Sequence, residues 1–196
     1  MRIIGGEFKS RIISMPKGVD MRPTQDKVRE AVFNIMGDIT GKVVLELFAG
    51  SGAFGIEAIS RGAAHVTFVD NNFRCVETIR TNLKTLEIDD GRYTVVRADA
   101  VKAFSRLAGQ GRAYDIIFMD PPYYRGLAKK CLINADACDI LSRNGLMMAE
   151  HFKKDVLPSG LHKLTLDWER GYGDAVITVF RRSYDKNQDS GLSGNV

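Results

Sequence analysis

The sequence is poor in cysteine and histidine, and it has no long uninterrupted apolar segment. It contains 3 cysteines and 3 histidines. Cys75, Cys131 and Cys138 are odd in number and have no histidine at metal-ligand spacing, so we interpret them as reduced core residues and expect no bound metal. No segment approaches the roughly 18 apolar residues of a membrane span, and no signal peptide is recognisable at the N-terminus. These absences predict a cytoplasmic protein without a membrane partner.

A strong excess of charge of one sign is also missing. The 28 Lys and Arg residues against 24 Asp and Glu residues give a formal net charge of +4, which suits a polyanionic partner without requiring one. With 196 residues, of which 44% are hydrophobic, the chain is long enough for one well-buried domain. We therefore expect a main domain at 21–182, a small N-terminal extension at 1–20 and a disordered polar tail at 183–196.

The first 20 residues are rich in β-branched residues that glycines interrupt. Two short strands joined by a turn fit this pattern, so the segment is predicted to be a β-hairpin outside the main domain. Its basic residues, among them Arg2, Lys9 and Arg11, can follow a phosphate backbone, although protection of an exposed strand edge explains them about equally well. A helix is expected to begin after Arg22, with Thr24 as its N-cap.

From residue 42 onward, short apolar segments alternate with amphipathic ones. The apolar segments predict strands at 43–48, 65–69, 93–96 and 114–119, and the amphipathic segments between them predict helices at 52–61, 72–86 and 101–107. Such alternation is typical of a parallel sheet that is covered by helices on both faces. The predicted fold class is therefore α/β, with a doubly wound sheet.

The C-terminal part predicts a different strand arrangement. A helix at 128–141 leads to a strand at 146–150, and two more strands are expected at 161–166 and 175–180. The residues at 169–174 are too few for a helical crossover, so the last two strands should form an antiparallel hairpin at one edge of the sheet. The complete prediction is a Rossmann-like fold with a seven-stranded, mostly parallel sheet.

A glycine-rich turn follows the first predicted strand of the sheet. Gly50, Gly52 and Gly55 fit the G-x-G-x-x-G pattern, which lets the backbone approach a ligand and points a helix N-terminus toward it. Asp70 ends the next strand about 20 residues later, where a carboxylate can bridge two ribose hydroxyls. Asp99 ends the third strand and, taken alone, is better explained as a helix N-cap.

Two kinds of ligand fit acidic residues at the carboxyl edge of such a sheet. One is a dinucleotide with its pyrophosphate on the glycine turn, and the other is S-adenosylmethionine, which has no phosphate. Glu46 lies within the first strand, where its charge would repel a pyrophosphate and attract the methionine ammonium or the sulfonium. The sequence therefore favours S-adenosylmethionine as the cofactor. A nicotinamide-binding oxidoreductase and a non-catalytic nucleotide-binding module stay open as alternatives.

The segment Asp120-Pro121-Pro122-Tyr123 directly follows the apolar strand at 114–119. Proline fixes φ at about −65° and removes N–H donors, so the local carbonyls form a rigid set of acceptors. A carboxylate, carbonyls and an aromatic ring together suit an amino group on a flat nitrogenous base. Taken alone, the segment is equally well explained as a simple turn.

In combination, these motifs resemble a known enzyme class. Four segments stand in the order typical of class I S-adenosylmethionine-dependent methyltransferases that modify exocyclic amino groups: Glu46 to Gly52, Asp70 to Asn72, Ala98 to Ala100, and Asp120 to Tyr123. With the segments 2–6, 22–24 and 29–34 added, the chain more narrowly resembles the RsmD-type bacterial small-subunit (16S) ribosomal RNA guanine-N2 methyltransferases. The likeness covers residues 2–180.

The resemblance implies a role for each motif. Asp70, with Asn71 beside it, would hold the ribose, and Asp99, with Ala100 beside it, would hold the adenine amino group. The methionine part would be held by Glu46, Phe48, Ala49, Gly50, Ser51 and Gly52. The catalytic turn would consist of Asp120, Pro121, Pro122 and Tyr123. RNA contacts would come from Arg2, Lys9, Arg11, Arg22, Thr24, Tyr124 and Arg125.

The implied reaction is methylation of the N2 amino group of a guanine in small-subunit ribosomal RNA. The substrate would be the RNA, free or within a small-subunit assembly intermediate, and the enzyme would act as a monomer. The Asp-Pro-Pro-Tyr turn is shared with DNA adenine-N6 methyltransferases, so methylation of DNA adenine stays open as an alternative.

Overall fold

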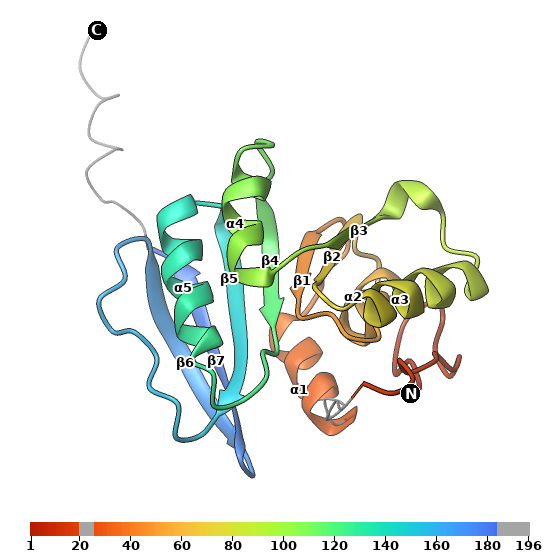
Figure 1. Cartoon of the computed structure of the whole chain (residues 1–196), viewed down its shortest axis with the longest axis horizontal. Coiled ribbons are helices and arrows are strands. Elements are labelled where there is room, and N and C mark those ends of the chain that lie inside the picture. The colour runs from red at the N-terminus through yellow and green to blue at the C-terminus, as the bar shows by residue number, and fades with distance from the viewer. Residues whose placement is uncertain (20–25, 184–196) are drawn as a thin grey trace, which may run out of the picture.

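Figure 1 shows the computed structural model of the chain, which describes residues 1–19 and 26–183. Within these residues the sheet has seven strands: β1 (Val43–Leu47), β2 (His65–Asp70), β3 (Tyr93–Arg97), β4 (Tyr114–Met119), β5 (Leu141–Phe152), β6 (Leu164–Tyr172) and β7 (Ala175–Arg182). The helices are α1 (Asp26–Met36), α2 (Ala53–Ser60), α3 (Phe73–Thr85), α4 (Ala100–Ala108), α5 (Leu127–Cys138) and the short 3-10 helix Asp90–Arg92. Arg22, Thr24 and the predicted tail from residue 184 onward lie outside the described residues.

The strand order in the sheet is β3-β2-β1-β4-β5-β7-β6. The pairs from β3 to β5 are parallel, whereas β7 runs antiparallel to both β5 and β6. The chain first places β2 and β3 on one side of β1 and then places β4 on the other side. The strand order therefore reverses between β1 and β4. These findings confirm the predicted doubly wound, mostly parallel sheet with an antiparallel C-terminal hairpin at its edge.

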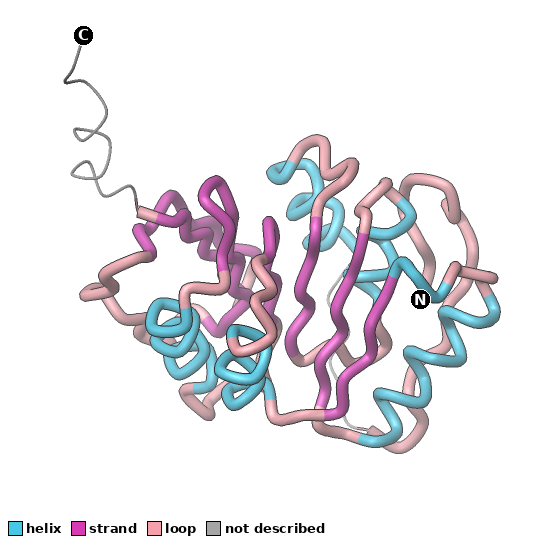
Figure 2. Tube along the Cα trace, turned by 90° about the horizontal axis from the view of Figure 1, so that it is seen from above, coloured by secondary structure: helices cyan, strands magenta, loops and turns pink. Residues whose placement is uncertain are grey.

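Helices cover both faces of the sheet, as the view in Figure 2 shows. On one face, α1, α2 and α3 pack over one apolar cluster, and on the other face α4 and α5 pack over a second one. Successive strand residues alternate between the two clusters, so that Val44 belongs to the first and Leu45 to the second. Burial on both faces explains why these strands appear in the sequence as continuous apolar segments.

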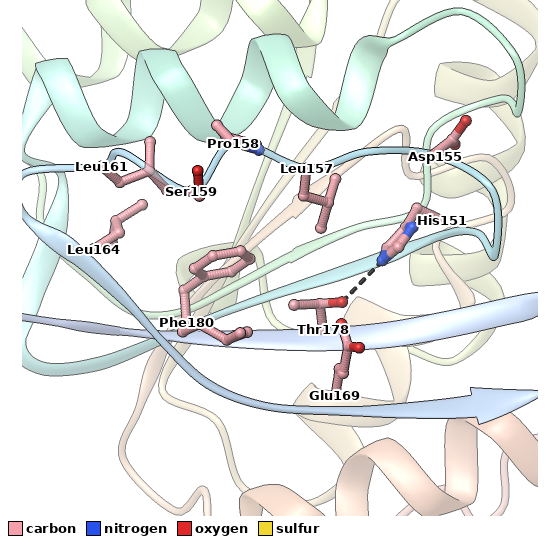
Figure 3. Close-up of a pocket in the computed structure, with 11 residues that line it drawn as sticks. His151, Asp155, Leu157, Pro158, Ser159, Leu161, Leu164, Glu169, Thr178 and Phe180 are labelled. Atoms are coloured by element: carbon pink, nitrogen blue, oxygen red, sulfur yellow. Dashed lines mark hydrogen bonds between the residues drawn. The ribbon is translucent and has the colours of Figure 1, made fainter.

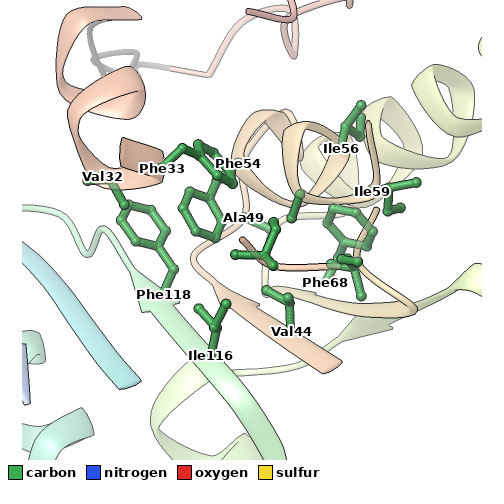
Figure 4. Packing of buried hydrophobic residues seen from close by; sticks show 14 of the residues in the cluster. Val32, Phe33, Val44, Ala49, Phe54, Ile56, Ile59, Phe68, Ile116 and Phe118 are labelled. Atoms are coloured by element: carbon green, nitrogen blue, oxygen red, sulfur yellow. The ribbon is translucent and has the colours of Figure 1, made fainter. Parts of the chain in front are cut away.

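Three phenylalanine rings connect α1, α2 and β4 (Figure 4). The ring of Phe54 stacks on both Phe33 and Phe118, with centroid distances of 4.8 and 4.0 Å. Such pairs stabilise a fold by roughly 0.5–1.5 kcal/mol each beyond the burial of their area. Because Phe118 lies just before the end of β4, the stack holds the carboxyl end of this strand against both helices.

Some predicted boundaries in the C-terminal part are wrong. β5 begins at Leu141 rather than at residue 146, since Leu141 already pairs with Tyr114 before an irregularity in the register. β6 runs to Tyr172, so the predicted connection at 169–174 is mostly strand and only residues 173–174 form the turn. β6 is an edge strand whose side chains are mostly exposed, and it therefore lacks the alternating apolar pattern that predicts a strand.

The N-terminal extension pairs with itself in antiparallel fashion, as the sequence predicts, but only over a short and irregular stretch. Within residues 1–19, Arg2 and Ile12 form an antiparallel bridge, the Ile3 amide donates to the Arg11 carbonyl at 3.0 Å, and the Ile13 amide donates to the Met1 carbonyl at 2.9 Å. Beyond this pairing the chain bonds to α2, because the amides of Ile4 and Gly5 donate to the two carboxylate oxygens of Glu57, each at 2.7 Å. A buried side chain from the main fold thus takes the amide groups that follow the paired residues.

Ser60, one turn further along α2, holds the next part of the extension. Its hydroxyl donates to the Gly5 carbonyl at 2.6 Å and accepts from the Phe8 amide at 2.8 Å, while its own carbonyl accepts the Glu7 amide at 2.7 Å. A Cβ on Gly6 would lie 1.8 Å from the Ser60 carbonyl oxygen, and Gly6 has a φ of +76°. Only glycine therefore allows the backbone to approach the helix this closely.

Two arginines balance the charge of the buried Glu57. Its carboxylate lies 2.8 Å from Arg61 Nε and 4.0 Å from Arg29 Nε. Arg29 is itself buried and donates to a backbone carbonyl of the extension at 2.7 Å. Ile3 and Ile13 of the extension belong to the same apolar cluster as α1 and α2. The extension is thus docked on the main fold by both polar and apolar contacts.

Replacement of Glu57 by Ala should destabilise the protein strongly, because it leaves two backbone amides and two arginines without their shared partner. We expect the free energy of unfolding to fall by about 3–5 kcal/mol, as for other broken buried pairs, in urea unfolding followed by circular dichroism. The matched control is Glu77→Ala, which removes an exposed ion pair with Arg80 on α3 and should cost less than about 1 kcal/mol. Equal small losses in both variants would contradict this account of the extension.

Candidate active site

A cavity of about 610 Å³ opens at the carboxyl edge of the parallel strands. It lies where the strand order reverses between β1 and β4, the place where open α/β sheets bind ligands. Its predicted lining residues come from the turns and strand ends that follow β1 to β4: Phe48, Gly50, Asp70, Asn71, Asp99, Asp120, Pro121, Pro122, Tyr123, Tyr124 and Arg125. The fold thus brings most of the predicted site residues into one cavity.

The glycine turn has a backbone conformation that few residues adopt. Phe48, Gly50 and Gly52 have φ angles of +56°, +56° and +76°. A non-glycine residue such as Phe48 in this region costs roughly 1–3 kcal/mol, and such strain is concentrated at functional sites. Phe48 and Gly50 face the cavity, whereas Ala49, Ser51 and Gly52 are buried and do not line it.

Asp70 connects the glycine turn to the end of β2. Its Oδ2 accepts the Gly50 amide at 2.9 Å, and its Oδ1 accepts the Asn72 amide at 2.8 Å. Each carboxylate oxygen can accept a further hydrogen bond. Asp70 can therefore hold the turn and accept from ligand hydroxyls at the same time, with Asn71 beside it in the cavity wall.

Asp99 has the structural role that the sequence suggested and also lines the cavity. As the N-cap of α4, its side chain accepts the Lys102 amide at 3.0 Å. Its place in the wall is compatible with the predicted contact to an adenine amino group. Ala100 is buried in the first turn of α4 and is not part of the wall.

Glu46 does not lie where the sequence suggests. Its side chain is buried under α2, outside the cavity wall, and its Oε2 accepts the Gly55 amide at 3.0 Å. A Cβ at position 55 would lie 2.3 Å from the Phe68 ring and 2.7 Å from Glu46 Oε2. The third glycine of the motif therefore allows α2 to pack closely on the sheet. The Glu46 side chain stabilises this helix by accepting the Gly55 amide.

The charge of Glu46 also differs from the expectation. Burial raises the pKa of this carboxyl group to about 8, and hydrogen bonds from the Gly55 and Phe54 amides oppose the shift only in part. The group is thus mostly protonated at neutral pH in the folded protein. The structure therefore gives no support to the idea that a negative Glu46 attracts the sulfonium.

The charge of the cavity wall distinguishes the two kinds of ligand instead. Asp70, Asp99, Asp120 and Glu150 line the cavity, and Arg125 is the only basic residue among its described lining residues. An acidic wall disfavours a pyrophosphate and suits a cofactor with a sulfonium and an ammonium group. The residues present therefore fit S-adenosylmethionine better than a dinucleotide.

Cys75 lines the same cavity, which the sequence did not predict. Burial and the neighbouring Asp70 carboxylate raise the pKa of its thiol to about 11. The group is therefore a neutral thiol at physiological pH and a poor nucleophile. Cys131 and Cys138 are free cysteines as well.

The Asp120-Pro121-Pro122-Tyr123 turn lies next to the cofactor motifs in the cavity wall. Leu47 pairs with Met119 across β1 and β4, so the glycine turn and the proline turn begin side by side. All four residues of the proline turn line the cavity. The pairing of neighbouring strands thus places a candidate acceptor site next to a candidate cofactor site.

An aromatic cluster lies at the mouth of the cavity. The Phe152 ring, at the end of β5, has centroid distances of 5.7 Å to Tyr123 and 4.8 Å to Tyr124. Tyr124 is 74% exposed and has a φ of +63°, so a strained backbone presents its ring to solvent. Exposed rings beside a cavity are typical of surfaces on which nucleic-acid bases stack.

Glu150 on β5 and Tyr172 on β6 line the cavity, although the sequence did not point to them. Glu150 had a usable signal, because it follows an apolar segment at a strand end, as Asp70 and Asp120 do. Tyr172 had none, since no apolar or turn pattern indicated that β6 reaches this far.

The predicted RNA contacts in the extension lie outside this cavity. Arg2, Lys9 and Arg11 are exposed, and none of them lines it. Arg11 Nη2 donates to the Thr85 carbonyl of α3 at 3.3 Å, while Val19 brings the end of the extension to the cavity wall. Their role in RNA binding stays a prediction.

A second cavity, of about 310 Å³, lies on another side of β5 (Figure 3). Leucines and Phe180 make it largely apolar, and His151 Nε2 lies 2.8 Å from Thr178 Oγ1 in its wall. It shares no lining residue with the first cavity, and none of the predicted site residues lines it.

Within residues 1–19 and 26–183, no cluster of three or more His, Cys, Asp or Glu side chains could hold a metal ion. In the same described part of the chain, no helix has both the length and the apolar character that crossing a membrane requires.

The strand order and the two turns at the cavity identify the enzyme class. A sheet in the order β3-β2-β1-β4-β5-β7-β6, with an Asp-Pro-Pro-Tyr turn beside a glycine turn, is that of a class I S-adenosylmethionine-dependent methyltransferase. Within this class, the chain belongs to the family described as "Conserved hypothetical protein 95", whose model matches residues 1–181. The family resemblance seen in the sequence motifs is thereby confirmed.

Individual relatives agree with this assignment. The chain is 38% identical over 183 residues to "Putative rRNA methyltransferase YlbH" of Bacillus subtilis (strain 168), covering 93% of this chain and 99% of that protein. It is 32% identical over 191 residues to "Ribosomal RNA small subunit methyltransferase D" of Escherichia coli (strain K12), covering 97% and 94%. Among solved structures, "Putative methyltransferase yhhF" from Escherichia coli superposes with a TM-score of 0.80 at 31% identity, covering 93% of this chain and 98% of that one.

Replacement of Glu46 by Gln should remove a pH dependence of stability. The folded-state pKa of about 8 lies above the ordinary 4.5, so the folded protein keeps a proton that the unfolded chain releases between these two values. As the pH rises from about 5 to about 9, the free energy of unfolding of the wild type should fall relative to that of Glu46→Gln, by an amount on the order of a few kcal/mol. Urea unfolding at several pH values measures the difference.

The control for this experiment is Glu77→Gln, which alters an exposed carboxylate on α3. Its free energy of unfolding should run parallel to that of the wild type across the same pH range. A parallel profile for Glu46→Gln as well would show that Glu46 ionises normally in the folded protein.

Proposed function

We propose that the protein transfers a methyl group from S-adenosylmethionine to the N2 amino group of a guanine in small-subunit ribosomal RNA. The observation that carries the proposal is the meeting of two turns in one cavity, the glycine turn after β1 and the Asp120 turn after β4. The names of the Bacillus subtilis and Escherichia coli relatives support ribosomal RNA as the substrate class.

Residues at the ends of β1, β2 and β3 would hold the cofactor. The glycine turn would bind the methionine part, Asp70 and Asn71 the ribose, and Asp99 the adenine amino group. When bound, the cofactor would supply an activated methyl group for guanine N2, and the proton that N2 loses would pass to the Asp120 carboxylate or to water. Glu46 would contribute indirectly, since it supports the helix that follows the turn.

Residues of the proline turn would orient the acceptor. The Asp120 carboxylate and the Pro121 carbonyl accept hydrogen bonds from the N2 amino group, which draws its lone pair back from the ring toward the nitrogen. Tyr123 stacks on the base, a contact worth roughly 1–3 kcal/mol in single-strand binders. Positioning is the main task of the protein, because well-oriented groups reach effective molarities of about 10⁵–10⁸ M.

The RNA would present an unstacked guanine, because a base within a duplex cannot reach the cavity. Tyr124 and Arg125, which line the cavity, and Phe152, whose ring packs on Tyr124, would contact the flanking nucleotides. The exposed cations of the extension, Arg2 and Lys9 among them, would follow the phosphate backbone. We further propose that the protein acts in the cytoplasm as a monomer, on free RNA or on a small-subunit assembly intermediate.

Methyl transfer with labelled S-adenosylmethionine tests the proposed function. The purified protein is incubated separately with small-subunit ribosomal RNA and small-subunit particles from cells that lack it, and with DNA from the same cells. The expected result is label in N2-methylguanine of the RNA or the particles. Label only in N6-methyladenine of the DNA would favour the alternative, and label in neither nucleic acid would contradict methyl transfer to both.

The variant Asp120→Ala should lose activity and keep cofactor binding, because Asp120 faces the acceptor side of the cavity. We expect kcat to fall by at least about 100-fold, the scale for a positioned group that handles a proton or an amino group. Calorimetry should give a dissociation constant for S-adenosylhomocysteine close to that of the wild type. Asp120→Asn keeps one acceptor oxygen and should retain more activity; parallel losses of binding and catalysis would refute these roles.

A further inference from the structure

Glu150 is an acidic residue of the cavity to which neither the motifs nor the proposed mechanism assigns a role. It lies near the end of β5 and is only 6% exposed. Met119 pairs with Ala149 across β4 and β5, so the next residues, Asp120 and Glu150, follow on neighbouring strands. Both line the same cavity. A second carboxyl group thus lies beside the acceptor turn.

The direction of the Glu150 side chain follows from the alternation along β5. Met148, two positions earlier, belongs to the apolar cluster under α1 and α2, which also contains Phe118 of β4. Glu150 therefore faces the same side as the start of the proline turn. His151 faces the opposite way and contributes to the second cavity, where it contacts Thr178 (Figure 3).

Guanine offers two adjacent donors on one edge, the N1–H group and the N2 amino group. An ionised carboxylate is only an acceptor, so two carboxylates in one wall suit two donors on one base. Neighbouring strands lie about 4.8 Å apart, which allows Asp120 and Glu150 to reach adjacent positions of the same ring. Adenine does not fit this arrangement, because its N1 is an acceptor and would face the Glu150 carboxylate.

We propose that Glu150 determines base specificity by accepting a hydrogen bond from the N1–H group of the target guanine. The inference rests on the proposed function and deepens it. Asp120 and the prolines orient an exocyclic amino group on either purine, whereas Glu150 admits only the base whose neighbouring ring nitrogen carries a proton. The Asp-Pro-Pro-Tyr turn alone does not make this distinction.

Tyr172 provides a second observation at the same wall. It lines the cavity from β6, and its buried hydroxyl has no hydrogen-bond partner within the part of the chain that the structure describes. A buried tyrosine hydroxyl usually finds a partner. The O6 carbonyl of guanine, on the other side of N1–H from the amino group, is an acceptor that this hydroxyl fits, whereas adenine has an amino group there.

The test compares two acceptor bases at the guanosine that the wild-type enzyme methylates. Once that position is mapped by mass spectrometry, RNA is assembled with either guanosine or 2,6-diaminopurine riboside there. Diaminopurine keeps the amino group at C2 but has an unprotonated N1. The wild type should prefer guanosine in kcat/KM by roughly 10- to 150-fold, the range for a lost hydrogen bond to a charged group.

In Glu150→Gln, this preference should shrink to a few-fold, because the carboxamide can turn and donate to the unprotonated N1. A merely structural role of Glu150 would lower kcat/KM for both bases without changing their ratio. The matched control is Glu169→Gln, which alters an exposed carboxylate in the second cavity and should keep the wild-type ratio. Thermal unfolding and S-adenosylhomocysteine binding show that both variants are folded.

Different results would disprove the methylation of guanine N2 and the role of Glu150. If the wild type transfers no methyl group to guanine N2, the proposed function falls, and the inference about Glu150 falls with it. If the wild type is active and Glu150→Gln keeps the full preference for guanosine, only the role of Glu150 is overturned.

Discussion

The parallel pairing of β1 with β4 brings the two halves of the site together. Leu47 lies opposite Met119, and both the glycine turn and the proline turn begin at the next residue. A slip of one residue would move every side chain of a strand to the other face. The apolar clusters on both faces of the sheet, together with the Phe33, Phe54 and Phe118 stack, exclude such a slip. The register of the core therefore sets the distance between the two halves of the site.

Helix α2 links this site to the N-terminus. It spans only residues 53–60, and all but its first residue are buried. Its first turn packs on Glu46 through Gly55, while its last turn presents Glu57 and Ser60 to the extension. A buried helix with polar contacts at both ends has little freedom to move. The docking of residues 1–19 and the conformation of the glycine turn thus depend on the same short helix.

Much of the fold could be predicted because its signals are local. The apolar strands β1 to β4, the glycine turn and the proline turn each carry their pattern within a few residues, and the parallel order follows from short strand-helix alternation. The sequence-based predictions are wrong or incomplete where contacts with distant residues determine the local structure. The N-terminal hairpin stays short because Glu57 takes the amide groups of Ile4 and Gly5, and β6 has no apolar pattern because it lies at the edge of the sheet. Glu46 looks like a cofactor ligand until α2 covers it.

Local sequence patterns are enough to predict the order of strands and helices and the chemical groups at the strand ends, since periodicity and turn residues act over a few positions. Which of the carboxyl groups face the cavity depends on tertiary packing. Glu46 and Glu57 are buried against α2, whereas Asp70, Asp99, Asp120 and Glu150 line the cavity. The direction and the ionisation of a side chain depend on the residues that pack around it, and those residues come from distant parts of the chain.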